Sequence, residues 1–170
     1  MRIAFVGQMG SGKSFMASKL AEEFNLKSFD LDQMIEKKYN LTINDIFAKY
    51  GEDFFRKAER EMLEKVCGID EIFILATGGG TPCFYDNIKL LREHFLVIYL
   101  NPKMQVHLEH LGKDEVGTRP LLEKADKVSS FLSQQKEERS PYYDQSHIEM
   151  QIHHGEKAYK ELKERLKRFI

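Results

Sequence analysis

The chain has 170 residues, of which 42% are hydrophobic and 31% charged, enough for one domain, residues 1–170, with a buried core. Its formal net charge of −1 excludes an overall attraction to nucleic acid or to a membrane surface. No apolar run reaches the roughly 18 residues of a membrane span, and Cys67 and Cys83 form no C-x-x-C pair, so we expect two reduced thiols in a cytoplasmic protein.

Short apolar runs alternate with helical patterns along the chain. The apolar runs of strand length are Ile3–Val6, Ile72–Ala76 and Phe95–Leu100, and less apolar candidates for strands are Lys27–Phe29 and His147–Ile152. The helical patterns are Lys13–Phe24, Asp32–Tyr39, Thr42–Tyr50, Glu52–Cys67, Phe84–Glu93, Pro102–Leu111, Lys124–Arg139 and Glu156–Phe169. Near-continuous apolar strands between helices predict an α/β fold in which helices cover both faces of a parallel sheet. Ligands of such sheets bind at the carboxyl ends of the strands, so residues that follow strands are the site candidates.

The first strand is followed directly by GQMGSGKS, from Gly7 to Ser14, which matches the phosphate-binding pattern G-x-x-x-x-G-K-[ST]. In such a loop the backbone N–H groups surround an anion, Lys13 reaches the outer phosphates and the Ser14 hydroxyl ligates Mg²⁺. The helix that follows adds its free N–H groups and its dipole. An ordinary Gly/Ser turn is the alternative, but strand, loop and helix all fall where the motif requires them.

Two carboxylates, Asp30 and Asp32, follow the second strand. Alternation along an extended chain sends both toward the same side. One carboxylate could then hold Mg²⁺ through water while the other accepts a hydrogen bond from an attacking hydroxyl. The alternative is that Asp32 is only the N-cap of the next helix, which its position before Met34 and Ile35 allows.

Two arginines are candidates for binding a carboxylate or a phosphate, because the guanidinium fork contacts two oxygens of such a group at once. Arg56 lies in GEDFFRKAERE on a predicted helix, and Arg139 ends another helix before Ser140 and Pro141. An exposed ion-pair face is the alternative for Arg56. For Arg139 the alternative is a favourable position in the field of a helix C-terminus.

The third strand is followed by three glycines, Gly78, Gly79 and Gly80, which indicate that the backbone approaches another group closely. Cys83 comes three residues later, and we expect its side chain to fill space. His107 and His110 share a predicted helix face, but a lone i, i+3 pair predicts a surface feature rather than a transition-metal site.

The segment 112–127, GKDEVGTRPLLEKADK, is polar, contains two glycines and carries Arg119. Phosphoryl transfer to a small acceptor must exclude water, so a mobile charged segment with an arginine suits a closing lid. An exposed surface loop is the alternative.

These segments together resemble one family, the shikimate kinases, which are small P-loop kinases related in fold to the nucleoside monophosphate kinases. The similarity covers about residues 1–145. Its ordered motifs are GQMGSGKS from Gly7, DLD from Asp30, IFAKYGEDFFRKAE from Ile46, TGGG from Thr77, TRPLL from Thr118 and ERSPYY from Glu138. The Arg56, glycine and Arg119 segments are far more specific than a phosphate loop alone.

The resemblance implies a three-layer αβα P-loop NTPase fold: a five-stranded parallel sheet flanked by helices, an acceptor-binding helical segment at about residues 32–60 and a mobile lid. It implies transfer of the γ-phosphoryl group of ATP to the 3-hydroxyl of shikimate, giving shikimate 3-phosphate and ADP in chorismate and aromatic amino-acid biosynthesis. Mg²⁺ would be the cofactor, and we expect a monomer with neither a nucleic-acid nor a membrane partner.

The resemblance also implies roles for individual residues. The contacts to ATP would come from Gly10, Ser11, Gly12, Lys13, Ser14, Phe15 and Arg119. The catalytic residues would be Lys13, Asp32 and Arg119, and the metal would be held by Ser14 and Asp30. Shikimate would be bound by Asp32, Arg56, Gly78, Gly79, Gly80 and Arg139. Positions that line or support the acceptor pocket are matched by Phe47, Phe55, Glu59, Pro120 and Leu121.

Two other functions stay open on the sequence. A related kinase acting on gluconate or on a nucleoside monophosphate would use the same loop, although no obvious base-binding insertion lies between Asp32 and Arg56. A non-catalytic ATP-binding module is the second alternative, although such a chain is expected to have lost some catalytic residues. The sequence also departs from the family at His110, which stands where an arginine usually packs on adenine.

Overall fold

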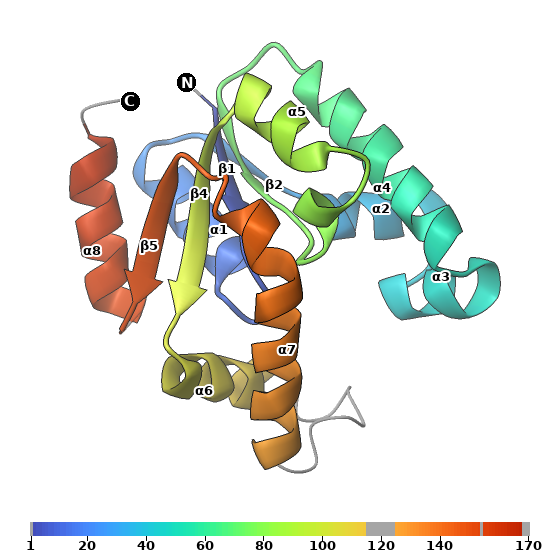
Figure 1. Ribbon diagram of the computed structural model, residues 1–170. Coiled ribbons are helices and arrows are strands. Elements are labelled where there is room, and N and C mark those ends of the chain that lie inside the picture. Colours follow the sequence, from blue (N-terminus) through green and yellow to red (C-terminus); the bar gives the residue numbers. More distant parts are fainter. Residues whose placement is uncertain (1, 115–124, 154, 168–170) are drawn as a thin grey trace.

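The computed structural model describes residues 2–114, 125–153 and 155–167. Its centre is a parallel sheet of five strands in the order β2-β3-β1-β4-β5 (Figure 1). The strands are β1 (Ile3–Val6), β2 (Lys27–Asp30), β3 (Phe73–Ala76), β4 (Leu96–Pro102) and β5 (Ile148–Ile152). The five predicted strands are therefore confirmed, with ends that differ from the predicted ones by at most two residues.

Eight α-helices and one 3₁₀ helix occur in the described part of the chain. They are α1 (Lys13–Glu23), α2 (Leu31–Tyr39), α3 (Ile43–Tyr50), α4 (Glu52–Cys67), η1 (Thr81–Cys83), α5 (Asn87–His94), α6 (Met104–Asp114), α7 (Ala125–Tyr143) and α8 (Gly155–Leu166). None of the helices in these described ranges is long and apolar enough to cross a membrane.

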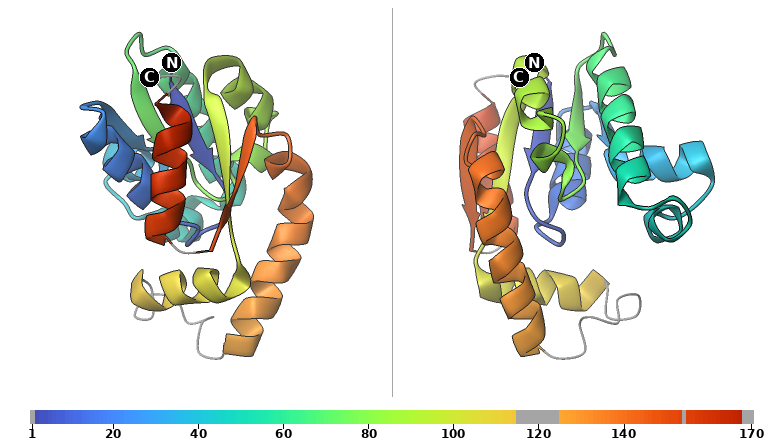
Figure 2. Two further views of the ribbon diagram at one scale, coloured as in Figure 1. Left: turned by 90° about the vertical axis from the view of Figure 1, so that its left-hand side faces the viewer. Right: turned by 45° about the vertical axis from the view of Figure 1, so that its right-hand side comes forward.

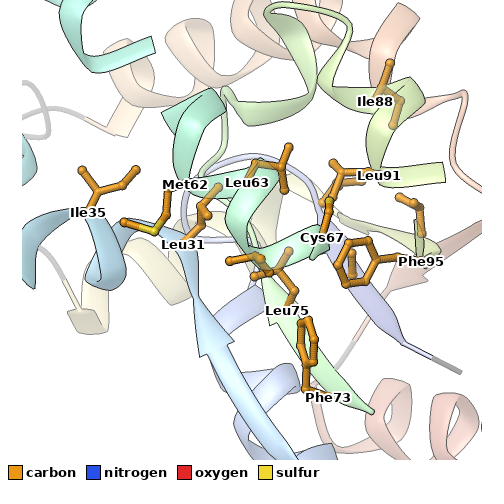
Figure 3. Packing of buried hydrophobic residues seen from close by; sticks show 14 of the residues in the cluster. Leu31, Ile35, Met62, Leu63, Cys67, Phe73, Leu75, Ile88, Leu91 and Phe95 are labelled. Atoms are coloured by element: carbon orange, nitrogen blue, oxygen red, sulfur yellow. The ribbon is translucent and has the colours of Figure 1, made fainter. Parts of the chain in front are cut away.

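Alternating residues of the sheet pack into two separate cores, one on each face, which is why the central strands β1, β3 and β4 read as near-continuous apolar runs. Ala4 and Val6 of β1 belong to the core that α4 and α5 cover, part of which is drawn in Figure 3. Ile3 and Phe5 belong to the core on the opposite face, beneath α1 and α8. Figure 2 shows α8 lying flat over that second face. The predicted three-layer arrangement is confirmed.

Two helix boundaries differ from the sequence prediction for local reasons. Helix α5 begins at Asn87 rather than near Phe84, because Tyr85 and Asp86 have φ of 49° and 55°, which no α-helix accommodates. Helix α7 continues past Arg139 to Tyr143 although Pro141 lies inside it. The carbonyl of Glu137, which a proline four residues later leaves without an N–H donor, accepts a hydrogen bond from Ser140 Oγ at 3.3 Å.

The segment expected to form a lid divides into two parts. Helix α6 extends to Asp114, so the first residues of the segment, 112–114, are helical rather than loop. Residues 115–124, which include Arg119, lie outside the described residues, so the lid remains a prediction. The arrowheads of β4 and β5 point toward α6 in Figure 1, which places this helix at the carboxyl end of the sheet.

Candidate active site

The candidate residues converge on the carboxyl end of the sheet from five separate elements. The loop after β1 leads into α1, Asp30 ends β2, and the three glycines follow β3. Arg56 comes from α4 on the β2 side, and Arg139 comes from α7 on the other side. This convergence is the one expected for a parallel sheet, in which the carboxyl ends of all strands share one edge.

The loop Gly7–Ser14 depends on glycine for its shape. Gly7, Gly10 and Gly12 all have positive φ, at 141°, 70° and 89°. A Cβ atom at Gly10 would lie 2.4 Å from Leu111 Cδ2, so this position requires glycine both for its backbone angle and for the packing of α6. The loop therefore packs against α6, the helix that precedes the predicted lid.

Two side chains donate to carbonyl groups of this loop. The buried Lys13 ammonium donates to the Gln8 carbonyl at 2.7 Å. His107 Nε2 donates to the Met9 carbonyl at 2.6 Å, and its ring is 2% exposed. Burial lowers the pKa of His107, which favours the neutral ring. The prediction that His107 is a surface feature is wrong, because α6 packs directly on the loop.

Ser14 and Asp30 meet at the start of α1. Ser14 Oγ donates to Asp30 Oδ2 at 2.5 Å, and Asp30 Oδ1 accepts from the Gln33 N–H at 3.2 Å. Asp30 is thus the N-cap of α2, so the alternative that Asp32 fills that position is wrong. A hydroxyl and a carboxylate side by side are the hard oxygen donors that Mg²⁺ prefers, so this pair fits the predicted metal site.

Asp32 lies in the first turn of α2, where its carboxylate is partly buried. Because β2 ends at Asp30, the argument from strand alternation does not apply to Asp32. Burial raises the pKa of Asp32 from 3.8 to about 6, and the negative charges of Glu59 and Asp30 add to the rise, while Lys13 opposes it. A Cβ atom at Gly78 would lie 2.7 Å from Asp32 Oδ1, so the carboxylate rests against that glycine.

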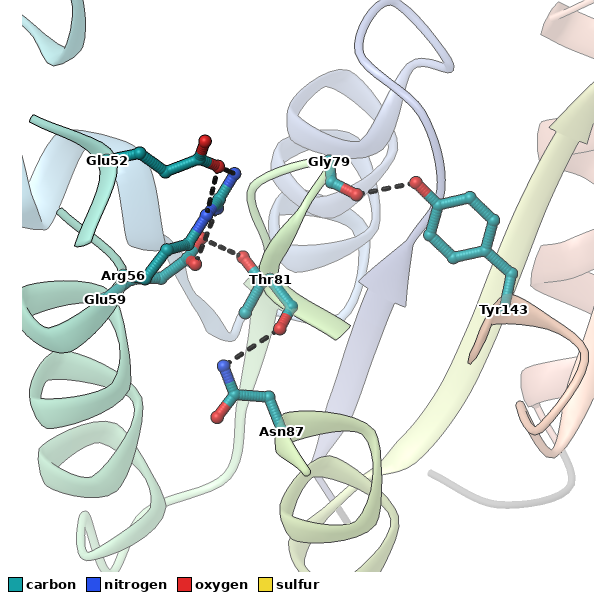
Figure 4. A network of polar contacts seen from close by, with 7 residues as sticks. All are labelled: Glu52, Arg56, Glu59, Gly79, Thr81, Asn87 and Tyr143. Carbon is teal, nitrogen blue, oxygen red and sulfur yellow. Dashed lines mark hydrogen bonds and ion pairs between the residues drawn. The ribbon is translucent and has the colours of Figure 1, made fainter. Parts of the chain in front are cut away.

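Arg56 lies in a buried cluster of charged and aromatic side chains. Its guanidinium donates to Glu52 at 3.1 Å and to the fully buried Glu59 at 2.9 Å (Figure 4). The guanidinium carbon also lies 4.1 Å from the centre of the Phe84 ring, close enough for a cation–π contact. The alternative of an exposed ion-pair face is wrong for Arg56, whose residue is only 8% exposed.

The glycines after β3 separate Arg56 from Arg139. A Cβ atom at Gly80 would lie 2.6 Å from Arg56 Nη2, and one at Gly79 would lie 3.3 Å from Arg139 Nη1. Both guanidinium groups therefore lie against the same short backbone segment, as close approach of the backbone predicts. Arg139 is in the body of α7 rather than at its end, so the helix-terminus alternative is wrong.

Several side chains at the site were not singled out from the sequence. Thr81 Oγ1 donates to Glu59 at 2.5 Å, and the Tyr143 hydroxyl donates to the Gly79 carbonyl at 2.6 Å (Figure 4). Tyr143 is inside the motif ERSPYY, but its spacing says nothing of a contact with residue 79. Phe84 carried no sequence signal that separated it from an ordinary core residue, and His107 was considered only as half of an i, i+3 pair with His110. Arg119, Pro120 and Leu121 lie outside the described residues.

The cysteines and possible transition-metal ligands give no second site. Cys67 and Cys83 are both free, and Cys67 is buried while Cys83 is half-buried. Burial raises the pKa of the Cys83 thiol to about 11, so it stays protonated near neutral pH. Within the described ranges, no group of three or more His, Cys, Asp or Glu side chains could hold a metal ion.

Comparisons with known proteins point to a single family. A family model described as "Shikimate kinase" matches residues 9–169. The chain is 36% identical to a shikimate kinase from Parabacteroides distasonis over 152 residues, which cover 86% of this chain and 85% of that protein. It is 41% identical to a shikimate kinase from Dictyoglomus turgidum over 123 residues, 72% of each chain.

Solved structures of the same family superpose on the described fold. A shikimate kinase from Bacteroides thetaiotaomicron has a TM-score of 0.88 at 31% identity, with 98% of each chain covered. A shikimate kinase from Acinetobacter baumannii in complex with shikimate has a TM-score of 0.84 at 30% identity, covering 98% of this chain and 90% of that one.

Proposed function

The chain belongs to the shikimate kinase family, and we propose that it transfers the γ-phosphoryl group of ATP to the 3-hydroxyl of shikimate. The products are shikimate 3-phosphate and ADP, one step of chorismate and aromatic amino-acid biosynthesis. One observation carries the proposal: Asp32 and Arg56 rest against Gly78 and Gly80 respectively, next to the phosphate loop. Asp32 can accept a hydrogen bond from a substrate hydroxyl, and Arg56 can bind a substrate carboxylate. The two side chains thus lie against one short backbone segment.

The loop from Gly10 to Phe15 is proposed to bind the ATP phosphates. Its backbone N–H groups and the N-terminus of α1 favour an anion at this place. Lys13 would turn from the Gln8 carbonyl toward the phosphates and stabilise the charge that develops during transfer. Arg119 would add a second positive charge from the predicted lid.

Ser14 and Asp30 are proposed to hold Mg²⁺, Ser14 directly and Asp30 through water. Their hydroxyl and carboxylate already touch, and Asp30 keeps its orientation by capping α2. Mg²⁺ uses few protein ligands when phosphate oxygens complete its octahedron, so two side chains suffice. When bound, Mg²⁺ would neutralise negative charge on the ATP phosphate groups that separate during transfer.

Asp32 is proposed to orient the 3-hydroxyl and to accept its proton. With a pKa raised to about 6, its carboxylate is ionised at neutral pH but is a stronger base than an ordinary aspartate. Arg56 and Arg139 are proposed to bind the shikimate carboxylate with their planar forks. The backbone of Gly78, Gly79 and Gly80 would contact the acceptor between these groups, because no side chain stands in the way.

A coupled ADP-release assay with Mg²⁺-ATP tests the proposal. Shikimate, gluconate, AMP and no acceptor are compared at equal concentrations. We expect turnover with shikimate to exceed the other three by at least about 100-fold, because only shikimate presents both a carboxylate and the ring hydroxyls to the site. Turnover with gluconate or AMP alone would assign a different acceptor. ATP binding without stimulation by any acceptor would indicate a nucleotide-binding module.

A further inference from the structure

Tyr143 is the last residue of α7, and its side chain is fully buried. Its ring stacks on Tyr99 with centroids 4.9 Å apart and planes at 26°. Its hydroxyl donates to the Gly79 carbonyl at 2.6 Å, as Figure 4 shows. Burial raises the pKa of Tyr143, which keeps the hydroxyl protonated as a donor. A phenyl ring would be sufficient for the stacking on Tyr99, so the hydroxyl has a separate role in its hydrogen bond to Gly79.

The glycine segment forms a four-residue turn. The Thr81 N–H donates to the Gly78 carbonyl at 3.2 Å, which makes Gly79 and Gly80 the central residues. Gly80 has φ −90° and ψ −13°, the values of the third residue in a type I turn. Type I and type II turns differ by rotation of the central peptide, and type II requires a positive φ that glycine readily adopts. Nothing in the local sequence Gly79–Gly80 therefore prevents this peptide from flipping.

The orientation of that peptide decides where the Gly80 N–H points. In a trans peptide the carbonyl and the following N–H point in opposite directions. Because the Gly79 carbonyl faces Tyr143, the Gly80 N–H faces away from α7, the side from which Arg56 approaches Gly80. Gly80 is buried, and no acceptor for its N–H lies among the described residues. A buried donor without a protein acceptor is suited to a ligand oxygen.

We propose that the Tyr143 hydroxyl is a positioning group that locks the Gly79–Gly80 peptide in the orientation that offers the Gly80 N–H to shikimate, on the side where Arg56 is proposed to bind the carboxylate. This inference rests on the proposed function, since the acceptor is shikimate. The opposite end of the turn is held independently, because Thr81 donates to Glu59 and its carbonyl accepts from Asn87 Nδ2 at 2.9 Å. Tyr143 thus fixes the orientation of the peptide between Gly79 and Gly80.

The test is Tyr143→Phe, which keeps the stacked ring and removes only the hydroxyl. We expect the KM for shikimate to rise about five- to tenfold, the effect of one lost hydrogen bond at the donor that faces the substrate. The dissociation constant of ATP measured without shikimate should stay within about twofold. The shift in Tm that saturating shikimate produces should shrink in parallel, which gives a readout independent of turnover.

Tyr99→Phe is the matched control, because it removes the hydroxyl of the other ring in the same stack, whereas the hydroxyl that donates to the Gly79 carbonyl belongs to Tyr143. We expect its shikimate KM to match that of the wild type. An unchanged shikimate KM in Tyr143→Phe, or an equal rise in both variants, overturns the positioning role. If the wild-type protein binds ATP but shikimate neither turns over nor raises the Tm, the proposed function itself has failed, an outcome distinct from either result.

Discussion

The two halves of the site are built in different ways. The phosphate loop is one contiguous stretch, Gly7–Ser14, whose glycines adopt positive φ so that its backbone can surround an anion. The cluster around Arg56 consists instead of side chains from α2, α4 and η1, with Glu59 and Thr81 fully buried. A backbone loop recognises what all nucleoside triphosphates share, whereas a set of side chains recognises one acceptor.

This difference predicts that substitutions in the two halves have different effects on the kinetics. Changes in the loop should lower turnover without changing which acceptor is used. Changes in the Arg56 cluster should alter the parameters of shikimate and leave ATP binding intact. A loop variant that changes acceptor preference, or an Arg56-cluster variant that weakens ATP binding, would contradict this division of roles.

Lys13→Met should have the largest effect. We expect kcat to fall about 1,000-fold, because the positive charge proposed to stabilise the transferred phosphoryl group is lost. The shikimate dissociation constant, measured from its Tm shift without ATP, should be unchanged. The control is Lys19→Met on the same helix, whose ammonium pairs with Glu156 at the surface, and it should retain wild-type rates.

Asp32→Asn should lower kcat about 100-fold or more, since a positioned proton acceptor contributes at least that much. The same variant should be more stable than the wild type at neutral pH. The folded-state pKa of Asp32, about 6, lies above its ordinary value of 3.8, so the folded protein binds the extra proton. The stability that Asp32 contributes is therefore lost as pH rises through about 4 to 6, and asparagine avoids this loss.

Thermal unfolding at pH 4 and at pH 7.5 checks the sign of this effect. The Tm advantage of Asp32→Asn over the wild type should be larger at pH 7.5, where the wild-type carboxylate is charged. An advantage that is larger at pH 4 would contradict the raised pKa. A variant with wild-type kcat would remove Asp32 from the proposed mechanism.

Arg56→Lys should raise the KM for shikimate about 10- to 100-fold and leave the dissociation constant of ATP unchanged. Lysine keeps a positive charge beside Glu59 but loses the fork that contacts two carboxylate oxygens. Lysine is preferred to alanine here, because alanine would leave Glu59 buried without its cation and destabilise the fold. Arg60→Lys on the same helix is the control, and steady-state kinetics with each substrate varied separate the two parameters.

Thr81→Val should have the smallest effect on catalysis and a measurable one on stability. The variant removes the hydroxyl that donates to Glu59 at 2.5 Å, which costs about 1–3 kcal/mol for a buried acceptor. A loss of that size lowers the Tm by roughly 2 to 12 °C in a chain of this length. Thr81→Ser keeps the hydroxyl and should lose less. Equal losses in both variants would assign the effect to packing.

The sequence predicted most of the fold because its signals are local. Apolar runs define β1, β3 and β4, less apolar segments mark β2 and β5, and the periodicity of the helices is strong enough to place most of their ends. The errors in helix ends come from local features that hydrophobic periodicity does not report. Helix α7 continues through Pro141 because the Ser140 hydroxyl donates to the Glu137 carbonyl, to which proline has no N–H to donate. Helix α5 starts later than predicted because Tyr85 and Asp86 adopt left-handed backbone angles.

The phosphate loop could be identified from the sequence alone, because all of its functional groups lie within one short stretch and the anion is bound mainly by its backbone N–H groups. Three further features depend on long-range packing: Arg56 is buried against Glu59 and Phe84, His107 donates to the phosphate loop, and Tyr143 donates to the Gly79 carbonyl. These contacts join residues up to 98 positions apart. Periodicity and spacing describe neighbours along the chain, whereas such contacts depend on how α4, α6 and α7 pack at the end of the sheet.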